Sequence, residues 1–424
     1  MCDMPWKDAL LGDLADVNPE ALGASPPFRW RFRYIDITSV AHGRVNWLAV
    51  PEYEYRSAPS RARRVVRPGD TLFSTVRPGL QAHVCADWDM QEGVICSTGF
   101  AVLRPRKLDA RFLFHTVFSE TVREQVRRRE VGSSYPAVSE SDLKLVQLTV
   151  PESPVEQGRI AEILDLLDAG IQEIESVLAK LKQVKSGLMQ SLLTCGLDEE
   201  GRIRDPLRNP EQFQSSPLGV VPKCWTISDL GGVLRERPKN GYSPVEAVNF
   251  EGGYILGLGC LTVDGFSQCQ LKNAPMNDRK LRQYALSPGD LLLSRSNTRD
   301  LVAMAGTFWP QPMPCFYPDL MMRLRPLPKL RPRFLEFLLR HSRVRRQLTN
   351  RACGTSGSMV KVNAGDVLKT VIAFPQSDEQ DAILARLDDV ESRISCEEEL
   401  RSKLTFTKTG LAHDLLAGRI RAKA

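Results

Sequence analysis

Side chains that could support acid–base or metal chemistry are sparse in this sequence. Only five histidines occur, at positions 42, 83, 115, 341 and 413, and none belongs to a motif that would organise a nucleophile or a metal ion. The paired acids Asp388-Asp389 and Glu397-Glu398-Glu399 fall in a strongly charged helical stretch, where a solvated face is a better interpretation than a nuclease site. Ten cysteines include no Cys-x-x-Cys pair, so we expect them to be reduced and to bind no zinc.

Two short motifs look like parts of enzyme sites but lack the surrounding elements. Ser25-Pro26-Pro27-Phe28 is similar to the motif with which amino-methyltransferases hold a target amine. A methyltransferase also needs a glycine-rich strand–turn–helix in a repeating βα pattern, which is absent from the sequence. Gly257-Leu258-Gly259-Cys260 leads into a strand-and-turn pattern instead of a helix that could cap a phosphate. We therefore expect no cofactor and no catalytic residue.

Charge and composition favour two domains that meet a polyanion. The chain has 424 residues, of which 42% are apolar, enough for two cores. Its net charge is +6, and residues 210–375 hold 22 Lys or Arg against 12 Asp or Glu. This excess favours a nucleic-acid partner, with a solvated basic surface as the alternative. No apolar run is long enough to cross a membrane and the amino terminus is not a signal peptide, so we expect a cytoplasmic protein.

Several basic and hydroxyl-bearing groups are candidate DNA contacts. In residues 29–34, arginines alternate with aromatic residues, which places them on one face of a strand. Arginine suits bidentate contact with guanine or phosphate, although a solvated strand face explains this pattern nearly as well. The candidates in the first 150 residues are Arg29, Arg31, Arg33, Arg61, Arg63, Arg64, Ser74, Thr75, Arg77, Ser133, Ser134 and Tyr135. Those in the second half are Ser294, Arg295, Ser296, Asn297, Thr355, Ser356, Ser358 and Lys361.

These candidates gather in loops and on helices. Asn297 and Arg295 suit the edges of adenine and guanine in the major groove. The small hydroxyl-rich loops at 132–135 and 354–358 could approach a phosphate closely, or they could be plain turns. Arginines also recur on two predicted helices, where they either line DNA or are solvated. They are Arg123, Arg127, Arg128, Arg129, Arg340, Arg343, Arg345 and Arg346.

The sequence contains an internal repeat with an offset of 219 to 224 residues. Matching strings keep the same order in both copies. They are Trp6 with Trp225, Arg67–Leu72 with Ser287–Leu292, Phe112-Leu113 with Phe334-Leu335, Gly132–Ser134 with Gly354–Ser356, Glu156-Gln157 with Glu379-Gln380, Lys185–Leu188 with Lys408–Leu411, and Leu192-Leu193 with Leu415-Leu416. The chain is therefore one unit written twice.

Each unit has a mixed part followed by a long helix. The first 150 or so residues of a unit carry short β-branched runs, Pro-Gly-Asp turns and helical stretches around 112–129 and 334–348, which predict an α+β domain. Apolar residues from Ile160 to Leu192 then step by fours and threes, with Lys185 at the one missing position, as in a coiled coil. The equivalent series from Ile383 to Leu415 is interrupted by Glu397 and Arg401.

The order of domains and helices has a geometric consequence. Two such helices can pair within one chain only if they run antiparallel, which places the domains at opposite ends around an approximate two-fold axis. This symmetry suits the antiparallel strands of DNA. A helix of about 38 residues is roughly 57 Å long, the length of about 17 base pairs, so it could set the distance between two half-sites.

With the repeat in place, the sequence resembles the specificity subunit of type I restriction-modification systems over nearly its whole length. The resemblance rests on Pro151–Gln157 and on Phe374-Pro375 with Glu379-Gln380 at the helix starts, on Lys185–Thr194 at a helix end, and on Pro217–Trp225 at the start of the second domain. The first domain begins with Pro5-Trp6 where the family has a fuller entry, and Thr194-Cys195-Gly196 stands where the family has a tighter Thr-Gly ending.

The resemblance implies a role in DNA recognition without catalysis. Target recognition domains would span 1–152 and 217–376, spacer helices 153–196 and 377–420, and a linker 197–216. Each domain would read half of a split double-stranded DNA target, two methyltransferase subunits would dock on the chain, and restriction subunits would join for cleavage. The alternatives are a coiled-coil adaptor without a DNA role and a stand-alone DNA methyltransferase.

Overall fold

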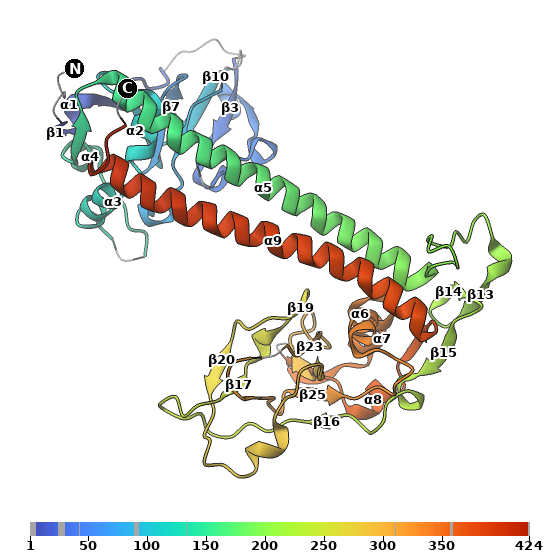
Figure 1. The fold of residues 1–424 in the computed structure, drawn as a ribbon. Helices are drawn as coiled ribbons and strands as arrows, with labels where there is room; N and C mark the ends of the chain where they lie inside the picture. The colour runs from blue at the N-terminus through green and yellow to red at the C-terminus, as the bar shows by residue number, and fades with distance from the viewer. Residues whose placement is uncertain are drawn as a thin grey trace. The chain divides into compact units, whose positions relative to one another are not determined.

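The computed structural model describes residues 6–23, 30–41, 43–88, 93–132, 134–309, 311–356 and 359–422. Helices and strands are mixed along the chain, which confirms the predicted α+β class (Figure 1). The chain forms two compact units, one of Met1–Val177 with Glu397–Ala424 and one of Leu178–Cys396. Each unit therefore combines one globular domain with a part of each of the two long helices, α5 (Pro154–Cys195) and α9 (Ser377–Leu416).

The strands of the first unit form two four-stranded sheets and two two-stranded ladders. One sheet has the order β6-β3-β10-β7, in which β3 and β10 are parallel, and the other is β2-β11-β8-β9 and antiparallel. β1 pairs with β12, and β4 with β5. The strands are β1 (Trp6–Leu10), β2 (Ala15–Val17), β3 (Arg31–Ile35), β4 (Val40–Ala41), β5 (Arg44–Val45), β6 (Glu52–Glu54), β7 (Ala62–Val66), β8 (Thr71–Ser74), β9 (Val84–Cys85), β10 (Gly93–Ser97), β11 (Phe100–Pro105) and β12 (Gln147–Pro151).

The second unit repeats the main part of this topology. β16-β25-β21-β23 corresponds to β2-β11-β8-β9, the parallel pair β17–β24 to β3–β10, and β15–β28 to β1–β12. The strands are β13 (Phe213–Ser216), β14 (Gly219–Pro222), β15 (Thr226–Asp229), β16 (Lys239–Asn240), β17 (Tyr254–Leu256), β18 (Leu261–Thr262), β19 (Gly265–Phe266), β20 (Leu271–Asn273), β21 (Leu291–Ser294), β22 (Ser296–Asn297), β23 (Ala305–Thr307), β24 (Cys315–Phe316), β25 (Met321–Leu324), β26 (Cys353–Ser356), β27 (Met359–Lys361) and β28 (Val371–Phe374). The sequence repeat is thus a repeat of structure.

Short helices accompany the strands in both units. They are α1 (Leu11–Leu14), α2 (Ala110–Thr116), α3 (Glu120–Arg127), α4 (Glu140–Lys144), α6 (Pro332–Arg340), α7 (Ser342–Arg351) and α8 (Ala364–Leu368). The helical stretch expected at 112–129 is therefore two helices. It divides because the Ser119 hydroxyl accepts a hydrogen bond from the Val122 amide and caps a new helix there.

The apolar series of the long helices is buried or half-buried within each unit. Ile160, Leu164, Leu178 and Leu192 of α5 are buried, and so is Lys185 at the missing position. Ile383 and Leu387 of α9 are fully buried, whereas Glu397 and Arg401 are partly exposed. The boundary between the two units in α9 lies between Cys396 and Glu397, where the apolar series is interrupted.

Equivalent ion pairs join the two long helices in each unit. In the first unit, Lys408 Nζ of α9 lies 2.5 Å from Asp168 Oδ1 of α5. In the second unit, Lys185 Nζ of α5 lies 2.9 Å from Glu391 Oε1 of α9. The two lysines are separated by the repeat offset, and so are the two acids, so the same contact is made with the helices exchanged.

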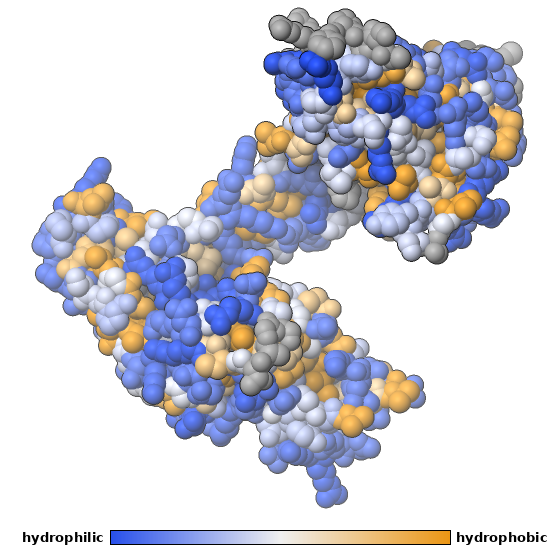
Figure 2. All heavy atoms as spheres, turned by 180° about the vertical axis from the view of Figure 1, so that it is seen from behind, coloured by the Kyte–Doolittle hydropathy of each residue, from blue (hydrophilic) through white to orange (hydrophobic). Residues whose placement is uncertain are grey.

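The domains pack on the long helices through shared hydrophobic cores. In the first unit, Phe112 and Leu113 of α2 belong to one core with Ile160 and Leu164 of α5. In the second unit, the equivalent residues of α6 belong to one core with Ile383 and Leu387 of α9. On the face seen in Figure 2, hydrophilic residues dominate and hydrophobic residues form scattered patches. Within the described part of the chain, no helix combines the length and the apolar character needed to cross a bilayer.

Candidate nucleic-acid interface

A Pro-Gly-Asp turn leads into a fully buried strand in each domain. Gly69 and Gly289 have φ of 87° and 86°, a left-handed conformation that glycine adopts without steric penalty. The following aspartates close the turn in the same way: Asp70 accepts from the Arg67 amide at 2.8 Å, and Asp290 from the Ser287 amide at 2.9 Å. The turns predicted from the sequence are confirmed, and β8 and β21 leave them at equivalent places.

The loop after β8 is joined to the hydroxyl-rich loop at 131–138. The Arg77 amide donates to the Pro136 carbonyl oxygen at 2.7 Å, and the Val138 amide donates to the Thr75 carbonyl oxygen at 3.0 Å. These bonds bring two predicted candidates together, since the guanidinium carbon of Arg77 lies 4.4 Å from the centroid of the Tyr135 ring. Ser134 is exposed next to Tyr135, and Ser133 lies outside the described residues.

The second domain joins the corresponding two loops with a short sheet. β22 pairs with β27, which also pairs with β26, and the Val362 amide donates to the Arg295 carbonyl oxygen at 2.9 Å. Asn297 and Lys361 therefore lie on neighbouring strands. The backbones of Thr355 and Ser356 belong to β26, and Ser358 lies outside the described residues. Both domains thus place two candidate loops side by side.

Three of the predicted hydroxyl contacts have buried side chains. Ser74, Ser294 and Ser296 have no exposed side-chain surface, because each continues the burial of the strand beside it. They are unavailable to a ligand in this conformation. The Thr75 hydroxyl donates to the Gly99 carbonyl oxygen at 2.9 Å, so its role here is also within the protein.

The strand arginines belong to the sheet β6-β3-β10-β7. Arg31 is exposed but pairs with Glu54 of β6 at 3.2 Å and with Glu52 at 3.6 Å. Phe32 and Tyr34 are buried, so the predicted alternation is confirmed. Arg61 and Arg63 are exposed, whereas Arg33 and Arg64 are half-buried. Arg29 lies outside the described residues, as does the Ser25–Phe28 motif.

Most of the helix arginines make contacts within the protein. In α3 and the turn that follows it, Arg123 pairs with Glu120, Arg128 with Glu124, and Arg129 donates to the Gln125 carbonyl oxygen. In the second domain, the side chains of Arg343 and Arg345 donate to backbone carbonyl oxygens of other segments.

Burial also decides the role of Arg340, which pairs with the fully buried Glu336 at 3.2 Å. Among the helix arginines, Arg127 and Arg346 are exposed, and their side chains make no hydrogen bond or ion pair with the described residues.

Two buried histidines support the segments next to these loops. His83 Nδ1 accepts from the Ser74 amide at 3.0 Å, and burial lowers the pKa of His83 to about 3. His341 Nε2 lies 2.8 Å from Gln190 Oε1 of α5, and burial, together with the nearby charge of Arg343, lowers the pKa of His341 to about 4. Both imidazoles are therefore neutral near pH 7, with Nδ1 free to accept a hydrogen bond.

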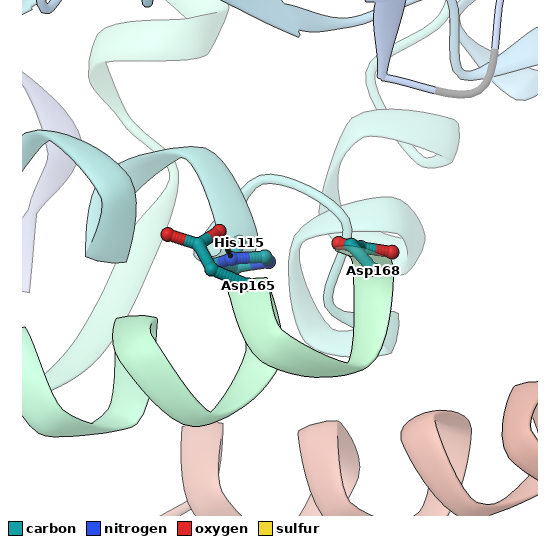
Figure 3. Close-up of side chains that lie close together, drawn as sticks. All are labelled: His115, Asp165 and Asp168. Atoms are coloured by element: carbon teal, nitrogen blue, oxygen red, sulfur yellow. Dashed lines mark hydrogen bonds and ion pairs between the residues drawn. The ribbon is translucent and has the colours of Figure 1, made fainter. Parts of the chain in front are cut away.

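His115, Asp165 and Asp168 lie close together where α2 meets α5 (Figure 3). His115 Nε2 lies 2.7 Å from Asp165 Oδ1, and the Arg111 guanidinium also binds this carboxylate. Asp168 pairs with Lys408. Hydrogen bonds from His115 and Arg111 outweigh burial and hold the pKa of Asp165 at about 2. Since cationic side chains already neutralise both acids, the cluster acts as a clamp between domain and helix.

The second unit carries a related clamp. Arg333, at the position of Arg111 in the repeat, pairs with Glu336, Asp388 and Glu391. Burial acts to lower the pKa of Arg333, but the neighbouring carboxylates of Glu336 and Glu391 outweigh burial, so the pKa of Arg333 is raised.

Sequence reasoning did not identify the roles of the acid and the amide that begin each long helix. Glu156 accepts two hydrogen bonds from Arg421, at 2.6 and 2.8 Å. Glu379 accepts from Arg204 at 2.7 and 3.1 Å and from the Trp225 indole at 3.1 Å. Each glutamate thus ties the start of one long helix to the segment that follows the other. The recurrence of Glu-Gln at the repeat offset was the signal for this role.

The glutamines beside them join the helix start to the domain. Gln157 donates to the Pro151 carbonyl oxygen and accepts from the Asp109 amide, both at 2.8 Å. Gln380 donates to the Pro375 carbonyl oxygen at 2.8 Å and accepts from the Arg331 amide at 2.9 Å. The Glu-Gln pair is therefore a structural joint present in both units.

The Gly257–Cys260 motif offers no phosphate site of the helix-capping kind. Leu258–Cys260 forms a single 3₁₀ turn followed by the β18–β19 hairpin, as the strand-and-turn interpretation predicts. The Gly259 amide is already bound to Gln270 Oε1 at 2.7 Å.

Comparisons with known proteins agree with this arrangement. The family model of the type I restriction modification DNA specificity domain matches residues 68–185 and 222–405, which is more than half of the chain. The chain is 24% identical over 315 residues to the specificity subunit of the type I restriction enzyme EcoKI of Escherichia coli K12, covering 74% of this chain and 64% of that protein. It is 22% identical over 344 residues to the MjaVIII specificity subunit of Methanocaldococcus jannaschii, covering 78% and 76%.

Two solved structures share the fold. A chain from a study of complex assembly and conformational transition in the type I R-M system has a TM-score of 0.57 at 24% identity, with 98% of this chain and 99% of that chain covered. The type I restriction-modification S subunit of M. genitalium has a TM-score of 0.57 at 12% identity, with 98% and 97% covered. A duplicated α+β domain, a joined pair of loops in each copy and the family match together show that this chain belongs to the family of type I restriction-modification specificity subunits, the HsdS family.

Proposed function

We propose that this chain is the DNA-reading subunit of a type I restriction-modification complex. Residues 1–152 and 217–376 are the target recognition domains, and each reads one half of a bipartite double-stranded target. The observation that carries this proposal is the joined loop pair, which recurs at the same place in both domains although its residues differ. A shared frame with different loops suits two different half-sites.

The contacts within each unit support an antiparallel pair of spacer helices, formed by residues 153–196 and 377–420. In the first unit, Glu156, Asp168 and Gly170 of α5 lie against Arg421, Lys408 and Leu404, so rising numbers meet falling numbers. At 1.5 Å per residue, the 42 residues of α5 span about 63 Å. We propose that this length sets the distance between the half-sites, with residues 197–216 as the linker.

The surface of the proposed DNA contact consists of exposed candidates, together with the half-buried Asn297. In the first domain these are Arg77, Ser134, Tyr135, Arg61 and Arg63. In the second domain the joined loops place Asn297 and Lys361 on neighbouring strands. Arg31 is held by glutamates, so its contribution to DNA binding would require those pairs to open.

Catalysis is assigned to partner subunits. We propose two methyltransferase subunits and restriction subunits as partners, as the specificity-subunit relatives suggest, with this chain as their scaffold. Under this proposal, the isolated chain neither methylates DNA nor binds S-adenosylmethionine. Methylation by the chain without partners would contradict the assignment.

Exchange of the first domain is the direct test. In a host that carries the complete system, methylome sequencing should give both half-sites and their spacing. Replacing residues 1–150 with the domain of a relative should change one half-site and leave the other half-site and the spacing unchanged. A change in both halves would refute the modular assignment.

Salt dependence separates DNA reading from an adaptor role. Lysine and arginine contacts to phosphates release counterions, so affinity for duplex DNA should fall steeply between about 50 and 200 mM salt. An assembled complex whose DNA affinity did not change over this range would favour the adaptor.

A further inference from the structure

The loop after β8 contains two non-glycine residues in the left-handed region. Arg77 has φ 49° and Gln81 has φ 50°. In the second domain, Ala303 has φ 62° and lies at the repeat equivalent of Gln81. This second position is therefore part of the frame that both domains share. The left-handed backbone at Arg77 has no such counterpart, since Asn297, at the matching place, does not have a positive φ.

This conformation is unfavourable for a side chain other than glycine, and surrounding contacts must maintain it. The Arg77 amide is bound to the Pro136 carbonyl oxygen, and the Arg77 carbonyl oxygen accepts from the Leu80 amide at 2.9 Å. The turn Pro78–Leu80 that follows packs against α3. The loop thus fixes where the arginine side chain leaves the surface.

The side chain of Arg77 packs on the ring of Tyr135. The guanidinium carbon of Arg77 lies 4.4 Å from the centroid of this ring, and both side chains are exposed. Within the described part of the chain, Arg77 has no carboxylate partner. Stacking on an aromatic face orients the planar guanidinium while its edge N–H groups stay free to donate.

We infer that Arg77 is a specificity-determining residue that reads a guanine in the first half-site, and that Tyr135 is its positioning residue. Guanine presents two acceptors, O6 and N7, in the major groove, and they match the two donors of an arginine fork. A phosphate can also accept such a fork. Phosphates are alike in both half-sites, however, whereas this position differs in side chain and backbone between the two domains, and this difference favours a base contact. This inference rests on the proposed function.

The equivalent place in the second domain carries different chemistry. Asn297 is half-buried, and its Oδ1 accepts from the Thr298 amide at 2.8 Å. A carboxamide cannot reproduce the charged two-donor fork of arginine. The guanine contact from this place in the fold is therefore assigned to the first domain.

Binding of the assembled complex to modified duplexes tests the inference. After the target is known, each guanine of the first half-site is replaced in turn by 7-deazaguanine, which lacks the N7 acceptor. The wild-type complex should bind one of these duplexes about tenfold or more weakly. The Arg77→Gln complex should bind that duplex and the unmodified target equally well, because the fork is absent.

Further variants separate a structural role from a reading role. Arg77→Gly should fold with an unchanged or higher Tm, because glycine adopts this backbone freely, and should still lose the 7-deazaguanine effect. Tyr135→Leu should reduce the effect, and Tyr135→Phe should restore it because the ring is kept. Arg127→Gln, an exposed control on α3, should keep the 7-deazaguanine effect of the wild-type complex.

Three results would overturn the inference. A first half-site without a G·C pair excludes the contact at once. If Arg77→Gln weakens binding to every duplex by the same factor relative to the wild-type complex, Arg77 contacts a phosphate. If the Arg77→Gln complex keeps the 7-deazaguanine effect, another residue reads the base. In each case a wild-type complex that still distinguishes both half-sites leaves the proposed function intact, whereas a wild-type complex without sequence preference contradicts the proposed function itself.

Discussion

Lowering the pH from 7 to 5 should destabilise the first domain through His83. This imidazole is buried, stacks on Phe73 with 4.1 Å between ring centroids, and accepts the Ser74 amide at Nδ1. Its pKa is about 3 in the folded chain and about 6.5 when unfolded. Between these values the unfolded state binds the extra proton, so stability is highest above pH 6.5 and falls as the pH is lowered.

The magnitude follows from the two pKa values. At pH 5 a free imidazole is almost fully protonated, whereas the buried one is almost fully neutral. One pH unit of differential protonation corresponds to about 1.4 kcal/mol, so the step from pH 7 to pH 5 should lower the free energy of opening by about 2 kcal/mol. This change in free energy depends little on the pKa of His83 in the folded chain, since that pKa lies well below 5.

Hydrogen exchange of the peptide that contains β8 measures this opening locally. After correction for the intrinsic exchange rate, wild type should lose about 2 kcal/mol of protection between pH 7 and pH 5. His83→Asn keeps an acceptor near the Ser74 amide but does not titrate, so its loss should be much smaller. His413→Asn, at an exposed histidine, is the matched control and should behave as wild type. Equal losses in wild type and His83→Asn would refute the reasoning.

Three further substitutions test the joints and loops. Glu379→Gln should lower the free energy of unfolding of the second unit by about 3 kcal/mol in a urea titration, because it leaves a largely buried arginine unpaired; the exposed Glu211→Gln of the same unit should change it little, and equal effects would contradict the joint. Lys185→Ala should destabilise the protein more than Lys408→Ala, since the side chain of Lys185 is 10% exposed and that of Lys408 is 29% exposed. A lower urea midpoint for Lys408→Ala than for Lys185→Ala would argue against burial as the cause. Gly354→Ala would place a Cβ 2.4 Å from a backbone carbonyl oxygen, so hydrogen exchange across β26–β27 should increase, and unchanged protection would show that the hairpin can shift.

The repeat, the turns and the long helices could be predicted because their signals are local in the chain. The turn at Gly69 requires a left-handed residue before an aspartate, and the seam from Ile160 to Leu192 requires only a period. Burial of Ser74 and Ser296 could not be predicted in the same way. A hydroxyl after an apolar strand looks like the start of an exposed loop, and only the packing of distant segments shows that the strand's burial continues.

Strand register and helix packing decide which partner each arginine side chain contacts. Arg31 meets Glu54 because β3 and β6 are antiparallel in one particular register, and Arg345 reaches the carbonyl oxygens of Asp300 and Val302 because α7 packs beside that turn. Neither relation has a local signal. Composition therefore overstates the number of arginines free to meet DNA.

The helix joints and the proposed reading residues obey different constraints. The glutamates 156 and 379 and the glutamines beside them make matching contacts in both units, because each domain must attach to one helix start and to the end of the other helix. Arg77 and Asn297 occupy matching places but differ in side chain and in backbone conformation. These two positions can differ because each is supported from within its own domain, by loop-to-loop hydrogen bonds, and not by the helix joint. Under the proposed function, a change of half-site would therefore leave the joints undisturbed, which is the physical condition for reading two unlike sequences with one duplicated fold.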